Sequence, residues 1–68
     1  MTDVETKMLL VLGDRLKTAR EKCGLSYRKV QEITGINKTT LSNMEKGRHN
    51  PKTTTWLRLT IMYEKYGN

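Results

Sequence analysis

Residues 35–47, GINKTTLSNMEKG, are rich in side chains that form hydrogen bonds. Lys38, Thr39, Thr40 and Asn43 bring an ammonium, two hydroxyls and an amide into one short stretch. These groups donate to or accept from polar ligands, but they form no nucleophile–base pair. The segment therefore indicates recognition through hydrogen bonds rather than catalysis.

The rest of the chain offers little chemistry for a reaction or for a metal. Cys23 is the single cysteine and His49 the single histidine, and no carboxylate pair suggests a catalytic cleft. A lone thiol excludes an intrachain disulfide and is typical of a reducing cytosol. We therefore predict no enzyme activity, no metal, no cofactor and no small-molecule ligand. The longest apolar run, Met8–Leu12, is too short to span a bilayer, and no segment reads as a signal peptide.

Positive charge is concentrated in the middle of the chain. The whole sequence has 13 basic and 7 acidic residues, a net charge of +6. Residues 26–52 alone contain six basic and two acidic residues, a net charge of +4. A basic window of this kind suits a polyanionic partner, although a soluble lysine-rich surface would look the same.

The periodicity of apolar residues predicts a single all-α domain over residues 1–68. One helix is expected at about 4–23, where Thr2 or Asp3 could cap its start and Gly24 would end it. The polar residues 1–7 are expected to fray. Three further helices are expected: from the cap Ser26 to Gly35, from the cap Asn37 to about Lys46, and from Thr53 to Tyr66. No alternating run indicates a strand. A chain of 68 residues buries a limited core, so these helices must pack well or a second subunit must help.

The side chains expected to face inward recur at three- and four-residue steps. They are Leu9, Leu12, Leu16, Ala19, Cys23, Val30, Ile33, Ile36, Leu41, Met44, Trp56, Leu59, Thr60 and Tyr63. Leu57, Ile61 and Met62 are expected to leave an apolar surface on the outer side of the last helix.

Two short helices joined through Gly35 leave the second with one buried face and a free N-terminal end. Lys38, Thr39, Thr40 and Asn43 lie on the free side. A helix of this kind fits the major groove of B-DNA, where base edges present donors, acceptors and the thymine methyl group.

The segment LGDRLKTAREKCGLSYRKVQEITGINKTTLSNMEKGRHNP resembles the lambda-repressor-like helix-turn-helix family, also called Cro-type or Xre-type. The resemblance extends from Leu12 to about Tyr63. It is carried by R-L-x-x-x-R at 15–20, G-L-S at 24–26, Gly35-Ile36, and L-S-x-x-E-x-G at 41–47. It implies a compact bundle of four to five helices with the helix-turn-helix at about 26–47. It also implies binding of a pseudo-palindromic double-stranded operator by a homodimer, in the cytoplasm and at the nucleoid of a bacterium or a phage-infected host.

Position by position, the resemblance assigns roles to individual residues. The positions that match base-reading positions are Lys38, Thr39, Thr40 and Asn43. Those expected at the DNA backbone are Tyr27, Arg28, Asn37, Lys46, Arg48, His49, Asn50 and Lys52. Arg20 and Glu45 match a structural pair that ties the first helix to the third.

Three features depart from the family pattern. Tyr27 stands where Gln is frequent, and Gln31 stands where a small residue is usual, so its side chain must bend outward or open the helix crossing. Few residues remain after Tyr66 for a fifth helix, which is expected to be short or missing. The apolar run Met8–Leu12 could cover that gap or form a dimer surface.

The resemblance points to the small Cro-like transcriptional regulators of phages, prophages and mobile elements, and among them to a repressor. An antitoxin or anti-repressor that holds another protein, or a small phage architectural or excision factor, would also be basic and helical. The sequence leaves these alternatives open, together with the operator sequence and the sign of regulation.

Overall fold

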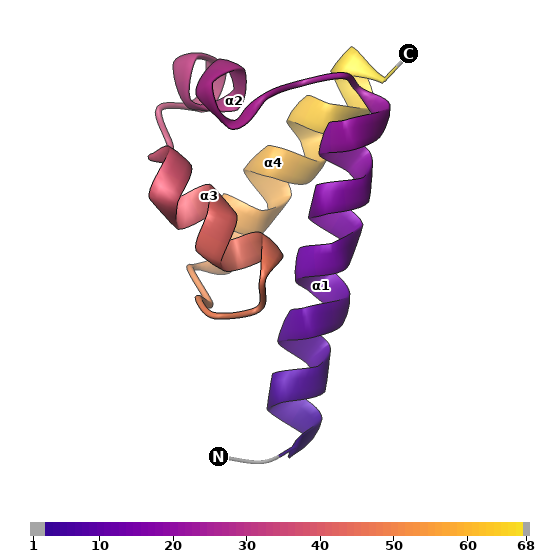
Figure 1. Cartoon of the computed structure of the whole chain (residues 1–68), viewed down its shortest axis with the longest axis vertical. Helices are drawn as coiled ribbons and strands as arrows, with labels where there is room; N and C mark the ends of the chain where they lie inside the picture. The colour runs from indigo at the N-terminus through magenta and orange to yellow at the C-terminus, as the bar shows by residue number, and fades with distance from the viewer. Residues whose placement is uncertain (1–2, 68) are drawn as a thin grey trace.

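The computed structural model describes residues 3–67, which form four helices (Figure 1). They are α1 (Asp3–Lys22), α2 (Tyr27–Thr34), α3 (Lys38–Glu45) and α4 (Thr53–Tyr66). The described residues contain no strand and no fifth helix, so the predicted all-α bundle is confirmed in its four-helix form. The predicted boundaries agree with the observed ones to within about one residue.

Local signals in the sequence fix these boundaries. Ser26 caps α2, where its hydroxyl oxygen accepts the Lys29 N–H at 3.1 Å. Gly35 ends α2 with φ at +77°, a left-handed conformation that costs glycine little and other residues much. No atom lies within 4 Å of the place that a Cβ at Gly35 would take. The backbone conformation, rather than crowding, is what requires glycine here.

The core lies where α1 packs against α3 and α4 and where α2 packs against α3. Its buried apolar side chains come from all four helices: Leu16, Val30, Leu41, Met44, Leu59, Met62 and Tyr63. Removing a leucine or methionine of this kind from water stabilises the fold by about 1.5–3 kcal/mol. Ala19, Cys23, Ile33, Ile36 and Trp56 pack around the core as partly buried residues, as their spacing predicted.

Gly13 marks the closest approach of two backbones. A Cβ at this position would lie 2.4 Å from the carbonyl oxygen of Met44 and 2.7 Å from that of Glu45. Gly13 is buried within α1, so the missing side chain lets α1 lie directly on the end of α3. No pattern in the sequence distinguishes this glycine from the others.

Several expected positions are wrong. Leu12 is 38% exposed: its neighbour Gly13 lies against the end of α3, whereas Leu12 lines an open groove between α1 and α4. In α4 the inner positions are Leu59, Met62 and Tyr63, so Met62 is buried instead of exposed, while Thr60 is exposed. Residues 3–7 are helical instead of frayed, and Thr2 lies outside the described residues.

The N-terminal half of α1 extends beyond the rest of the molecule (Figure 1). Its apolar side chains are largely exposed, with Met8 at 57% and Val11 at 52%. The run Met8–Leu12 therefore does not serve as a substitute for a fifth helix in the core. On α4, Leu57 and Ile61 are exposed as expected.

Candidate nucleic-acid interface

Helices α2 and α3, with the loop that follows α3, lie to one side of α1, and the end of α3 packs against α1 (Figure 1). The turn between them is held by its own hydrogen bonds. The Thr34 hydroxyl donates to the Val30 carbonyl at 2.8 Å and accepts the Ile36 N–H at 3.2 Å. Val30 is completely buried, so its packing in the core also holds the turn in place.

The first two amides of α3 are both satisfied by side chains. Asn37 Oδ1 accepts the Thr39 N–H at 2.7 Å, which confirms Asn37 as the N-cap. Gln31 Oε1 accepts the Lys38 N–H at 2.8 Å. Because Gln31 belongs to α2, this bond joins the two helices at the end of α3 that is expected to enter a groove.

The outer face of α3 is opposite its buried face. Leu41, Met44 and Glu45 point inward. Thr39 and Asn43 are separated by four residues and therefore share the outer face, which continues to Lys46 at the C-cap.

The four predicted base-reading residues differ in exposure. Lys38 and Thr39 are exposed, whereas Thr40 and Asn43 are half-buried at the edges of the packed face. A half-buried side chain has fewer accessible rotamers than an exposed one, so Asn43 would lose less conformational entropy on binding a ligand than Lys38 would.

The loop after α3 supplies exposed cations beside this face. Four of the predicted DNA-backbone residues are both basic and exposed: Arg28 on α2, and Lys46, Arg48 and Lys52 after α3. His49, in the same loop, is also exposed. The Arg48 N–H donates to the Asn43 carbonyl at 2.8 Å, which anchors the loop to α3. Asn50 uses its amide oxygen to accept the Trp56 Nε1–H at 3.2 Å, so it also ties the loop to α4.

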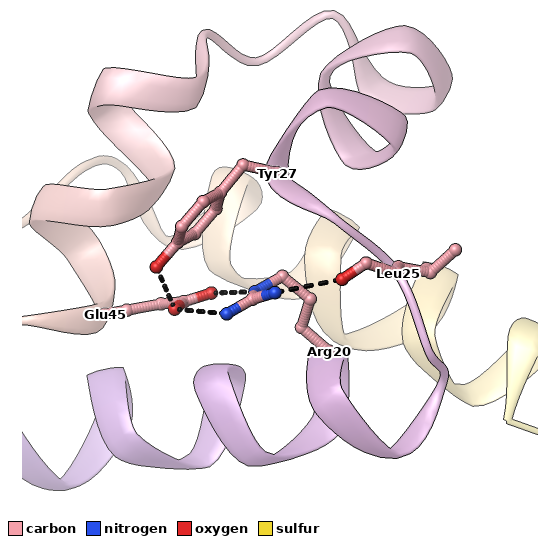
Figure 2. A network of polar contacts seen from close by, with 4 residues as sticks. All are labelled: Arg20, Leu25, Tyr27 and Glu45. Atoms are coloured by element: carbon pink, nitrogen blue, oxygen red, sulfur yellow. Dashed lines mark hydrogen bonds and ion pairs between the residues drawn. The ribbon is translucent and has the colours of Figure 1, made fainter.

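Arg20 and Glu45 form the structural pair that the resemblance implied (Figure 2). Arg20 Nε donates to Glu45 Oε2 at 2.8 Å, and its two terminal nitrogens donate to Glu45 Oε1 at 3.3 Å and to the Leu25 carbonyl at 2.9 Å. The Glu45 side chain is only 3% exposed. The pair therefore joins α1, α3 and the segment before α2, and it neutralises an acid that would otherwise lie beneath the basic face.

Tyr27 belongs to the same network. Its hydroxyl donates to Glu45 Oε1 at 2.8 Å, and the Arg20 guanidinium lies 4.1 Å from the centre of its ring. The hydrogen bond to Glu45 raises the pKa of Arg20, and burial together with the bond to Glu45 raises the pKa of Tyr27. Tyr27 was expected at the DNA backbone, yet its single hydroxyl proton points inward to a carboxylate.

Sequence reasoning missed the role of Gln31. It predicted only that the longer side chain must bend outward or open the crossing, and the exposed side chain does bend outward, to the first amide of α3. The distance of seven residues between Gln31 and Lys38 is no recognised capping signal, so the contact depends on how α2 and α3 pack.

Within residues 3–67, no group of three or more His, Cys, Asp or Glu side chains lies in an arrangement that could hold a metal ion. No helix of this part of the chain is long and apolar enough to cross a membrane.

Comparisons with known proteins place this arrangement in a family. Residues 11–64 match the family described as "Helix-turn-helix domain". The chain is 40% identical over 52 residues to the HTH-type transcriptional regulator ImmR of Bacillus subtilis (strain 168), covering 76% of this chain and 41% of the relative. It is 29% identical over 55 residues to an uncharacterized HTH-type transcriptional regulator of Haemophilus influenzae, covering 81% of this chain and 56% of the relative.

The chain thus spans about half the length of the curated relatives it matches. No solved structure matches it. The family match covers most of the chain and includes α2, α3 and the turn between them. The chain therefore belongs to the Cro/Xre-like helix-turn-helix family.

Proposed function

We propose that the chain is a sequence-specific DNA-binding domain of a transcriptional regulator, with α3 as its recognition helix in the major groove. The outer face of α3 carries this proposal: Lys38 and Thr39 are exposed on it, Asn43 lies half-buried at its edge, and side-chain caps hold the helix at its N-terminal end. The relatives named as HTH-type transcriptional regulators support it. Regulation takes place in the cytoplasm, at the nucleoid.

The excess of positive charge on the side formed by α2, α3 and the following loop favours binding of a polyanion. Within residues 26–52 Glu45 is buried and paired, which leaves Glu32 as the one exposed acid beside six basic residues. Glu32 itself lies 3.8 Å from Lys29. Each phosphate neutralised by a cation releases counterions, so affinity for DNA falls steeply as salt rises.

The domain acts as a Cro-like repressor on a pseudo-palindromic operator. Two copies bind half-sites about 34 Å apart, one helical turn of B-DNA, and block access of RNA polymerase to the promoter. The exposed apolar residues of α1, or those of α4, supply a surface on which the copies can meet.

Single substitutions separate base reading from backbone binding. On the best duplex selected from a random pool, Lys38→Ala and Asn43→Ala should each weaken binding by about 1–3 kcal/mol and relax preference at one base pair. Arg48→Ala should weaken binding to all duplexes equally and reduce the salt slope by about one. Lys17→Ala, an exposed position on α1, is the control and should change neither. Binding is measured by fluorescence anisotropy, and full affinity in both α3 variants would refute the assignment of the recognition face.

A second candidate is a protein-interaction module, such as an antitoxin or anti-repressor. The apolar side chains exposed on α1 and α4 favour it, because contiguous exposed apolar surface often marks a protein interface. A groove of about 400 Å³ between these helices, lined in part by Leu12, Trp56 and Tyr63, adds to that surface. Tight DNA binding by the pure protein, with no partner recovered from the native host, would count against this candidate.

A further inference from the structure

The side-chain amide of Gln31 has an oxygen that accepts a hydrogen bond and a nitrogen that remains available as a donor. Its Oε1 accepts the Lys38 N–H at 2.8 Å, which fixes the orientation of the planar amide. The other half, Nε2, carries two N–H donors, and within residues 3–67 it donates to no protein atom. These donors therefore lie at the N-terminal end of α3, beside the first residue of the proposed base-reading set.

The resemblance assigns two α2 residues to the DNA backbone: Arg28 is exposed, whereas Tyr27 already has partners within the protein. The Tyr27 hydroxyl donates to Glu45, and its ring lies against Arg20. To donate to a phosphate, Tyr27 would have to release a buried carboxylate that is 3% exposed. That loss makes Tyr27 a poor phosphate ligand in this chain.

We infer that Gln31 links the operator backbone to the recognition helix: Oε1 holds the Lys38 N–H while Nε2 donates to a phosphate oxygen. The inference rests on the proposed function, since it needs α3 to enter the major groove. A neutral amide suits this task because backbone contacts commonly come from Asn and Gln as well as from cations. The contact positions α3 by fixing it to a phosphate, and it carries no sequence information of its own.

Two substitutions separate the cap from the phosphate contact. Gln31→Glu keeps an acceptor for the Lys38 N–H, and a carboxylate is favoured at a helix N-terminus, so the melting temperature should be unchanged or raised. It removes the N–H donors and adds a negative charge, so DNA affinity should fall. Gln31→Ala removes both halves of the amide without adding charge, so it controls for repulsion between the new carboxylate and DNA.

Binding is measured by fluorescence anisotropy on the best duplex from a random pool and on an unrelated duplex, each across a salt series. We expect Gln31→Ala to weaken binding to both duplexes by the same factor, about tenfold, with the salt slope unchanged because no cation is lost. Gln31→Glu should weaken it by at least as much while the fold stays intact.

Wild-type affinity in either variant would overturn the inference. A loss confined to one base pair of the selected duplex would also overturn it, since that result indicates base reading. If the wild-type protein itself prefers no duplex, the proposed function fails and the inference fails with it. If the wild type binds selectively and both variants match it, only the role of Gln31 is wrong.

Discussion

Glu45 is the residue on which the packing of three segments depends. Its carboxylate accepts hydrogen bonds from Arg20 and Tyr27, and its side chain is almost completely removed from water. A buried carboxylate is tolerated only while its partners remain, because an unpaired buried charge is costly.

Removing Arg20 should therefore destabilise the fold strongly. We expect Arg20→Ala to lower the free energy of unfolding by about 3–5 kcal/mol, since it leaves Glu45 buried without its cation. Urea denaturation measures the loss, with Lys17→Ala on the same helix as an exposed control expected to change it by less than about 0.5 kcal/mol. A loss below about 1 kcal/mol in Arg20→Ala would contradict a structural role for the pair.

Tyr63 has a buried hydroxyl for which the described residues provide no hydrogen-bond partner. Burial and the nearby Glu45 charge raise its pKa to about 12. An unfolded tyrosine loses its proton near pH 10, whereas folded Tyr63 retains it to higher pH. Folding stability should therefore be complete below about pH 10 and fall as pH rises through about 12.

The substitution Tyr63→Phe tests this pH dependence. At pH 8 the variant should be as stable as the wild type or up to about 1 kcal/mol more stable, because an unpaired polar group is removed. Between pH 10 and 12 the wild type should lose roughly 2–3 kcal/mol relative to the variant. Chemical denaturation at several pH values measures both, and parallel curves for the two proteins would show that Tyr63 does not titrate as described.

At the scale of the elements, the contact between α1 and α3 depends on Gly13. Replacing a glycine inside a helix by alanine normally stabilises the helix by about 1 kcal/mol. Here the added Cβ would meet the backbone carbonyl oxygens of Met44 and Glu45, which cannot move without shifting α3.

We therefore expect the opposite sign. Gly13→Ala should destabilise the protein by about 1–3 kcal/mol, as overpacking does in well-filled cores. Thermal unfolding followed by circular dichroism measures the change, and Thr18→Ala, exposed on the same helix, is the matched control with a small gain expected. A stabilised Gly13→Ala protein would mean that α1 and α3 are further apart than described.

The helix boundaries could be predicted because their signals are local. Ser26, Asn37 and Gly35 act within a few residues of their own position, so sequence spacing alone reveals them. The rotation of α4 about its axis could not be predicted. Thr60 and Met62 exchange places relative to the prediction: Met62 is buried in the core, whereas Thr60 is exposed and lines the open groove between α1 and α4.

In the candidate site, the exposed positions at the start of α3 could be predicted, whereas the contacts between helices could not. The outward position of Lys38 and Thr39 follows from the apolar pattern of α3. The contacts of Gln31 with Lys38 and of Tyr27 with Glu45 join residues of different helices, and they depend on tertiary packing that no local pattern specifies.

At the scale of the whole molecule, the two sides differ in character. The side formed by α2, α3 and the following loop is basic and polar, whereas α1 and α4 expose apolar side chains such as Met8, Val11 and Ile61. This division suits a domain that binds a polyanion with one side and a second protein surface, including its own copy, with the other.

Selection of bound duplexes from a random pool at near-physiological salt, followed by sequencing, shows whether α3 reads DNA bases. Sequence-specific reading by α3 predicts a recurrent two-fold motif whose half-sites lie about one helical turn apart. DNA retained only at low salt, with no enriched motif, would contradict the claim, because it would mean that the basic side binds the phosphate backbone without reading bases.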